Sequence, residues 1–226
     1  MDINQQQWEK QYQAGQGYLD YPNELVVIAY HRLKANLPDK VDCLDYGFGS
    51  GNNSDFLIQR VDSLYGLEIS EAAKQMAKIR LSHYSNFDEN NFVVVENQLV
   101  DEFVGKFDLV NAWHVLSYNQ DASLKAAIKR IAEYLKSGGF LITSLATRDD
   151  ISYVQGVPQV THENDFVLSD LIATQAGCKV IIPKDEQDFE RYFNEQFETI
   201  DIGIQSRHSL RNNDQHSHYY GIFQKR

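Results

Sequence analysis

Short apolar runs alternate with amphipathic stretches along most of this 226-residue chain. Runs of strand length, most of them ending at turn residues, recur through its first two thirds: residues 41–46, 63–68, 92–95, 107–113 and 140–145. The clearest helical stripe has apolar residues at steps of three and four: Leu124, Ala127, Ile128, Ile131, Ala132 and Leu135. We expect Ser137–Gly139 to end that helix. This alternation predicts βαβ units and a parallel sheet.

Both ends of the chain depart from this rhythm. Near the C-terminus, isoleucines alternate with polar residues from Ile200 to Ile204, and a last strand is predicted at 219–223 beyond a turn-like cluster at 212–215. Strands joined by a short turn run antiparallel, so the predicted fold is a doubly wound, Rossmann-like α/β sheet with an antiparallel strand near its end. Residues 1–38 precede the first strand, and an apolar stripe after Pro22 predicts a helical cap on the same single domain rather than a second one.

Composition narrows the possible partners. Apolar residues make up 42% of the chain and charged residues 23%, which suits a globular protein with one core. The net charge of −11 disfavours nucleic acid, whose phosphates an acidic surface repels. Cys43 and Cys178 are too few for a disulfide framework, and no apolar run approaches the roughly 18 residues of a membrane span. Without a signal-peptide pattern either, we expect a cytoplasmic protein that does not bind membranes.

One turn carries the candidate chemistry. Gly47, Gly49 and Gly51 alternate just after the first strand, where glycine lets the backbone turn tightly and approach a ligand. Glu68 ends the second strand at the spacing where an acid meets ribose hydroxyls in nucleotide-binding folds. The dinucleotide fingerprint requires a third glycine where Asn52 stands. An NAD(P)-dependent oxidoreductase is therefore disfavoured, and it stays as one alternative. A member of the fold that binds a cofactor without catalysis is the other.

The pattern from Asp45 to Gly51, acid-x-G-x-G-x-G, resembles the first motif of class I S-adenosylmethionine-dependent methyltransferases. The resemblance covers roughly residues 41–145, and in strand order the terminal hairpin at 197–223 as well. It implies a seven-stranded, mostly parallel sheet with an antiparallel C-terminal strand. It also implies S-adenosyl-L-methionine as the cofactor.

The same resemblance implies residue roles. The three glycines would approach the methionine part of the cofactor, and Asp45 would hold its amino group, directly or through water. Glu68 would accept both ribose hydroxyls, and Ile69 would touch the adenine. Three further residues complete the implied cofactor site, two after the third strand and one in the fourth: Glu96, Asn97 and Asn111.

Aromatic and imidazole side chains add candidates with two interpretations each. Trp8 and Tyr12 share a helix face and either close over the cofactor, as an N-terminal W-x-x-x-Y segment does in the family, or are ordinary packing. His114 follows the fourth strand and is either a general base or a structural histidine. The pair in His216-Ser217-His218 lies beside a predicted turn without a third ligand, so no metal site is expected.

Absent motifs favour a small acceptor. No Asp-Pro-Pro-Tyr or Asn-Pro-Pro-Tyr follows the fourth strand, as it does in enzymes of this fold that methylate DNA amines, and no Pro-Cys pair occurs. We therefore expect O- or N-methylation of a small molecule. The segment 147–164 is predicted to be a long connection that either shapes the acceptor pocket or lies free on the surface. The sequence does not indicate an oligomeric state.

Overall fold

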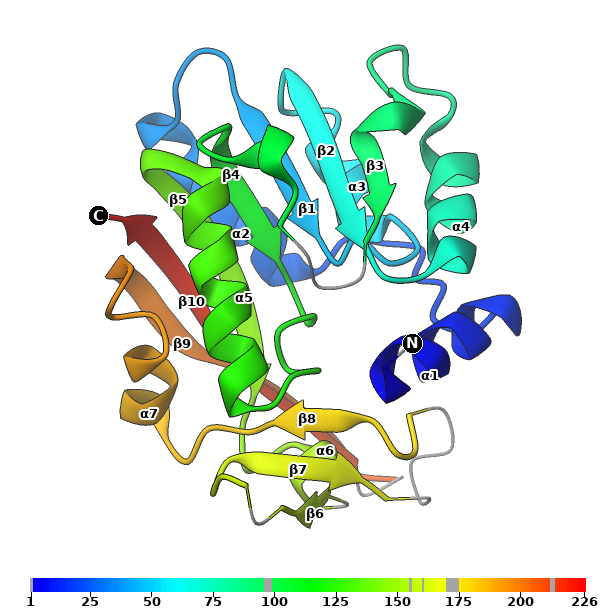
Figure 1. Cartoon of the computed structure of the whole chain (residues 1–226), viewed down its shortest axis with the longest axis vertical. Coiled ribbons are helices and arrows are strands. Elements are labelled where there is room, and N and C mark those ends of the chain that lie inside the picture. Colours follow the sequence, from blue (N-terminus) through cyan, green and yellow to red (C-terminus); the bar gives the residue numbers. More distant parts are fainter. Residues whose placement is uncertain (1, 96–98, 155, 160, 170–174, 212–213) are drawn as a thin grey trace.

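A seven-stranded sheet forms the centre of the computed structural model, which describes residues 2–95, 99–154, 156–159, 161–169, 175–211 and 214–226 (Figure 1). Its strand order is β3-β2-β1-β4-β5-β10-β9. The strands are β1 (Asp42–Tyr46), β2 (Ser63–Glu68), β3 (Phe92–Val94), β4 (Phe107–Ala112), β5 (Leu135–Ala146), β9 (Phe197–Ser209) and β10 (Asp214–Lys225). Strands β1 to β5 pair in parallel, and β10 is antiparallel to both β5 and β9. The expected sheet is thereby confirmed.

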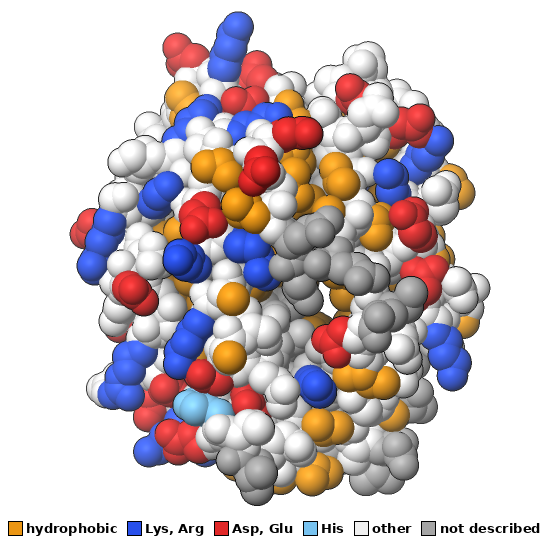
Figure 2. Space-filling view, viewed as in Figure 1, with side chains coloured by type: hydrophobic (Ala, Val, Ile, Leu, Met, Phe, Trp, Pro, Cys, Tyr) orange, Lys and Arg blue, Asp and Glu red, His pale blue; other side chains and the backbone are white. Residues whose placement is uncertain are grey.

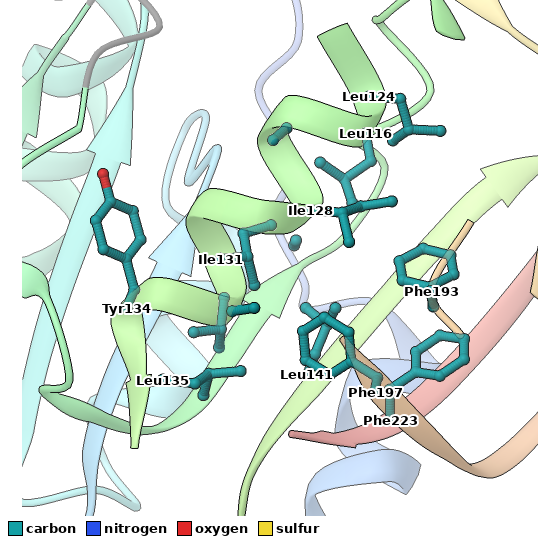
Figure 3. Packing of buried hydrophobic residues seen from close by; sticks show 14 of the residues in the cluster. Leu116, Leu124, Ile128, Ile131, Tyr134, Leu135, Leu141, Phe193, Phe197 and Phe223 are labelled. Carbon is teal, nitrogen blue, oxygen red and sulfur yellow. The ribbon is translucent and has the colours of Figure 1, made fainter. Parts of the chain in front are cut away.

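Helices cover both faces of the sheet. The longer ones are α2 (Glu24–Leu33), α4 (Glu71–Leu81) and α5 (Asp121–Tyr134); the shorter ones are α3 (Asn52–Leu57), α7 (Glu186–Arg191), η1 (Lys34–Asn36), η2 (Glu89–Asn91) and η3 (Asp101–Phe103). The predicted stripe of α5 is buried, and Figure 3 shows Leu124, Ile128 and Ile131 on the side of the helix toward Leu141 of β5. Among the described residues, no helix is long and apolar enough to cross a bilayer.

The expected end of the helix with the stripe from Leu124 to Leu135 was wrong. Helix α5 ends at Tyr134, because Leu135 is already extended and begins β5. Residues 137–139 instead form an irregular part of β5, where Gly138 has φ +76° and the register with β4 shifts. Helix α3 begins directly after Gly51, which is its N-cap and has a left-handed conformation.

The N-terminal 38 residues hold two helices in different places. Helix α2 buries Val26, Ala29 and Leu33 on one face of the sheet, close to the predicted stripe. Helix α1 (Ile3–Gln13) lies beyond the carboxyl ends of the strands, beside the start of α4 (Figure 1). Only α1 therefore lies where ligands of a parallel sheet bind, beyond the carboxyl ends of the strands.

A second sheet begins within residues 147–164, which we expected to be a long connection, and continues beyond that segment. It is antiparallel, in the order β6 (Gly156–Pro158), β7 (Asp165–Leu168) and β8 (Lys179–Ile181), and follows the short helix α6 (Ile151–Val154). It has a small core of its own: Ala146, Phe166, Leu168, Cys178, Val180 and Ile182. In Figure 1 it lies below the carboxyl ends of the central strands. Strands of three or four residues are too short to show a period in the sequence.

The C-terminal hairpin provides a test of the core. Phe223 of β10 is fully buried and stacks on Phe193 with ring centroids 4.3 Å apart (Figure 3). Phe223→Ala should lower the free energy of unfolding by about 3–5 kcal/mol, measured by urea denaturation, because it leaves a cavity. The matched control Ile79→Ala, on the exposed face of α4, should change it by less than about 0.5 kcal/mol. Equal effects would contradict this account of the hairpin.

Candidate active site

A cavity of about 1420 Å³ opens at the carboxyl ends of β1, β2 and β4, the edge where ligands bind in open parallel sheets. Seven of the predicted site residues line it: Trp8, Tyr12, Gly47, Gly49, Glu68, Ile69 and His114. Asp45, Gly51 and Asn111 do not line it. Glu96 and Asn97 lie outside the described residues. The structure therefore gathers most of the predicted residues around one space.

The three glycines of the turn have different surroundings, although all have positive φ. A Cβ atom on Gly47 would overlap Val115, and one on Gly49 would lie 2.7 Å from the hydroxyl of Tyr12. Gly51 instead faces Ala77 of α4, where a Cβ would lie 3.1 Å away. Gly47 and Gly49 thus shape the cavity wall, whereas Gly51 allows α3 and α4 to pack closely.

Glu68 joins the glycine turn to the end of β2. Its carboxylate accepts hydrogen bonds from the backbone N–H of Gly49 at 2.9 Å and of Ile69 at 2.7 Å. Burial raises the pKa of Glu68, and these backbone hydrogen bonds oppose that effect. Because a carboxylate oxygen can accept two hydrogen bonds, the buried side chain keeps acceptor capacity toward the cavity.

Asp45 lies behind the wall in a buried hydrogen-bonded group. Its carboxylate accepts from the Ser54 hydroxyl at 2.5 Å and from the Asn111 amide at 2.7 Å. Burial raises the pKa of Asp45 to about 6, and both hydrogen bonds oppose the rise. Among the described residues nothing donates to the buried Oδ1 of Asn111. Asp45 and Asn111 thus support the turn from behind and leave one acceptor open.

Helix α1 is attached on two sides of the cavity. The amide of Asn4 donates to the carbonyls of Tyr118 and Lys179 at 2.8 and 2.9 Å and accepts from the Lys179 N–H at 2.7 Å. Gln5 donates to the carbonyl of Ile69 at 3.0 Å, which ties the helix to the end of β2. The sequence analysis missed both residues, because polar side chains in a polar helix look like solvated ones.

The aromatic residues of α1 face the cavity. Trp8 and Tyr12 stack with ring centroids 5.7 Å apart, and Tyr118 meets Trp8 edge-on at 4.8 Å. The hydroxyl of Tyr12 lies over Gly49, and burial raises the pKa of that hydroxyl well above its usual range. The pair is thus packed against other aromatic rings, and Tyr12 covers the turn at Gly49; closure over a cofactor stays a prediction.

Three histidines line the cavity: His114, His216 and His218. His114 follows β4 with φ +57°, an uncommon conformation for a residue with a side chain. Its ring lies 4.3 Å from that of His218, centroid to centroid. Burial, with smaller effects of His218 and His216, lowers the pKa of His114 to about 3. This histidine is therefore neutral at physiological pH.

His216 and His218 also line the cavity, together with Asp150. They lie beside the turn of the hairpin, and β10 begins at Asp214, so both histidines are part of the strand. The spacing His-x-His could have revealed them, since alternate residues of a strand share a face. Among the described residues no group of three or more metal-binding side chains could hold an ion.

Comparison with known proteins decides among the enzyme classes that this geometry allows. The profile of the methyltransferase domain family matches residues 20–222. The chain belongs to this methyltransferase family. The methyltransferase is 28% identical over 156 residues to an uncharacterized methyltransferase of Geobacillus thermodenitrificans, which covers 67% of this chain and 70% of that one. It is 28% identical over 130 residues to a ubiquinone biosynthesis O-methyltransferase of Nitrosomonas europaea, covering 53% of this chain and 54% of the relative.

The fold agrees with this assignment. The N-methyltransferase NodS of Bradyrhizobium japonicum, solved in complex with S-adenosyl-L-homocysteine, superposes with a TM-score of 0.65 over 99% of both chains at 15% identity. The protein is a class I methyltransferase that uses S-adenosylmethionine. Its own residues fit that cofactor, since Glu68 keeps acceptor capacity and Gly47 and Gly49 bring bare backbone to the cavity. The oxidoreductase alternative is set aside, in line with Asn52 in place of a third glycine.

The buried Asp45 should make the stability of the methyltransferase depend on pH. Its pKa is about 6 in the folded protein and ordinarily 3.8, so its contribution is complete below about pH 4 and is lost as pH rises through 6. Relative to Asp45→Asn, the wild type should therefore lose on the order of 3 kcal/mol of unfolding free energy between about pH 4 and pH 7. Urea denaturation of both proteins at both pH values measures this difference. A constant difference would show that burial does not control this carboxyl group.

Proposed function

We propose that this methyltransferase transfers the methyl group of S-adenosylmethionine to an oxygen or nitrogen of a small-molecule acceptor. The observation that carries the proposal is the size and extent of the cavity. It reaches from Glu68 to the histidines of β10, and its volume of about 1420 Å³ exceeds the roughly 300–1,000 Å³ of a usual single-ligand site. One end therefore suits the cofactor, and the other leaves room for an acceptor.

The assignment of residues follows from their places in the cavity. Glu68 would accept the ribose hydroxyls, Ile69 would contact the adenine, and the turn at Gly47 and Gly49 would pass close to the methionine part. Asp45 and Asn111 do not line the cavity, so they would act on the methionine part only indirectly, by supporting the turn from behind. When bound, S-adenosylmethionine supplies a methyl group already activated on a sulfonium sulfur. The chain then contributes mainly proximity and alignment.

Several observations support a small acceptor over a macromolecule. Helix α1 and strand β8 flank the cavity, and α1 is attached to both the end of β2 and β8. The net charge is −11, and Figure 2 shows basic side chains interspersed with acidic ones on one face of the molecule. One relative bears the name of a ubiquinone biosynthesis O-methyltransferase, which is compatible with a small acceptor. A cytoplasmic location is part of this proposal and rests on the two buried free thiols.

The cofactor end can be tested through Glu68. Glu68→Gln should bind S-adenosylhomocysteine at least about tenfold more weakly in calorimetry, because hydrogen bonds to a charged group contribute about 1.5–3 kcal/mol each. Glu71→Gln, on the exposed first turn of α4, is the matched control and should bind as the wild type does. The wild type should also prefer S-adenosylhomocysteine to NAD. Unchanged affinity in a folded Glu68→Gln protein would refute this role.

Helix α1 is proposed to close over the bound cofactor. It should exchange amide hydrogens more slowly when S-adenosylhomocysteine is added, because a segment that contacts a ligand shares its binding energy. Hydrogen exchange of residues 3–13 measures the effect, and α7, of which no residue lines the cavity, serves as the internal control. Trp8 fluorescence should change in the same titration. If neither signal responds at saturation, the aromatic residues are packing alone.

A further inference from the structure

Ser144 determines which nitrogen of His114 carries the proton. The Ser144 hydroxyl is fully buried on β5 and accepts a hydrogen bond from the His114 backbone N–H at 3.0 Å. The same oxygen lies 3.1 Å from His114 Nδ1. Among the described residues no other acceptor takes the hydroxyl proton, so Ser144 donates to Nδ1, because a buried donor without a partner is costly. The ring proton of neutral His114 is then on Nε2.

Asp150 determines the state of His218 in a different way. Its carboxylate is buried just before α6 and accepts from the backbone N–H groups of Ser217 at 2.8 Å and Ser152 at 2.9 Å. Its Oδ2 lies 3.9 Å from His218 Nδ1 and 4.0 Å from His216 Nδ1. Within the described part of the chain, no lysine or arginine forms an ion pair with Asp150. The carboxylate favours a proton on Nδ1 of His218 and leaves the lone pair of Nε2 free.

We propose that His218 is the catalytic base of this methyltransferase, that Asp150 is its positioning residue, and that His114 donates a hydrogen bond to an acceptor whose reacting group is a weakly acidic hydroxyl. The proposal rests on the proposed function and refines its acceptor. It differs from the sequence-based hypothesis, in which His114 was the candidate base and a structural histidine was the other interpretation. A base next to a carboxylate is needed for a hydroxyl, whereas a neutral amine already has a free electron pair.

The proposed step balances as follows. The hydroxyl oxygen of the acceptor forms the new bond to the methyl carbon, and the electron pair of the breaking C–S bond stays on sulfur. The hydroxyl proton passes to Nε2 of His218, and the resulting imidazolium is stabilised by Asp150 until the proton leaves to solvent. His114 Nε2–H meanwhile holds the oxygen in place without competing for the proton.

The charges around His218 are consistent with this division. Burial lowers the pKa of both His114 and His218, but Asp150 opposes the effect at His218, and His216 adds to it. Other titratable groups line the same cavity on neighbouring elements: Tyr118, Lys179 on β8 and Arg207 on β9. Of the two histidines, His218 is thus the one whose charged form is favoured by a neighbouring carboxylate.

Imidazole nitrogen NMR tests the two protonation states without an acceptor. On ¹⁵N-labelled protein between about pH 5 and pH 8, His114 should show the Nε2–H tautomer throughout and should not titrate. His218 should show Nδ1–H when neutral, and Asp150→Asn should lower its pKa because the carboxylate charge is removed. A titrating His114, an Nδ1–H tautomer there, or a His218 pKa unchanged by Asp150→Asn would overturn the proposal.

4-Nitrocatechol is the probe for the acceptor, because its absorption reports ionisation of the hydroxyl. With saturating S-adenosylhomocysteine, the wild type and the control His208→Asn, on an exposed part of β9, should increase the ionised form. His218→Asn should not do so, and should lower kcat for methylation of the probe by S-adenosylmethionine about 100-fold or more. Asp150→Asn should move the acidic limb of the pH–rate profile to lower pH.

Other results of the same experiments would contradict the proposal. No spectral change with the wild type, full activity of His218→Asn, or methylation of 4-nitro-1,2-phenylenediamine in place of the catechol would overturn the hydroxyl assignment. A loss of activity in His216→Asn but not in His218→Asn would do the same. Calorimetry with S-adenosylhomocysteine separates a failure of the proposed function from a failure of this inference. If the wild type does not bind it, the proposed function is refuted, whereas the NMR result still stands.

Discussion

The hydrogen bond from the Gly49 N–H to the Glu68 carboxylate fixes the site on which everything else depends. It holds the turn after β1 against the end of β2, and the second oxygen of the same carboxylate is fixed by Ile69. A buried carboxylate that accepts two backbone hydrogen bonds cannot move without leaving donors unpaired. The cofactor wall is therefore rigid because the two strand ends share one side chain.

The rest of the cavity is built by parts that are not in the central sheet. Asn4 ties α1 to β8 by three hydrogen bonds, and Gln5 ties it to the end of β2. The small sheet brings its own apolar core and flanks the acceptor end. The central strands thus position the residues that we propose for the cofactor, whereas α1 and the small sheet line the part of the cavity that we propose for the acceptor.

The two ends of the cavity also differ in their electrostatics. At one end a carboxylate is held by backbone donors, and at the other a buried carboxylate lies beside imidazoles. Two histidines with rings 4.3 Å apart have different neighbours, because the Ser144 hydroxyl contacts His114 and Asp150 lies beside His218. In our proposal, these neighbours give the two imidazoles different tasks. Environment, more than residue type, decides which of them accepts a proton.

The sequence alone determined the central fold, and it predicted seven residues that line the cavity. Periodicity, turn glycines and the placing of Glu68 are local, and a parallel sheet brings successive strand ends to one edge whatever the details. It did not determine where α5 ends, because Leu135 is extended through its pairing with Phe107 of β4. Nor did it place Asp45 behind the wall or Gly51 against Ala77, since both depend on how α3 packs.

Only the tertiary structure brings together the residues around the part of the cavity that we propose for the acceptor. Asn4 and Lys179 lie far apart in the chain, as do His114 and His218, and no local pattern links them. They meet because the hairpin of β9 and β10 pairs with β5, which carries His218 past Ser144 and next to the end of β4. Contacts of this kind follow from the closing of the whole sheet and the docking of α1, so the sequence holds the residues and only the fold brings them together.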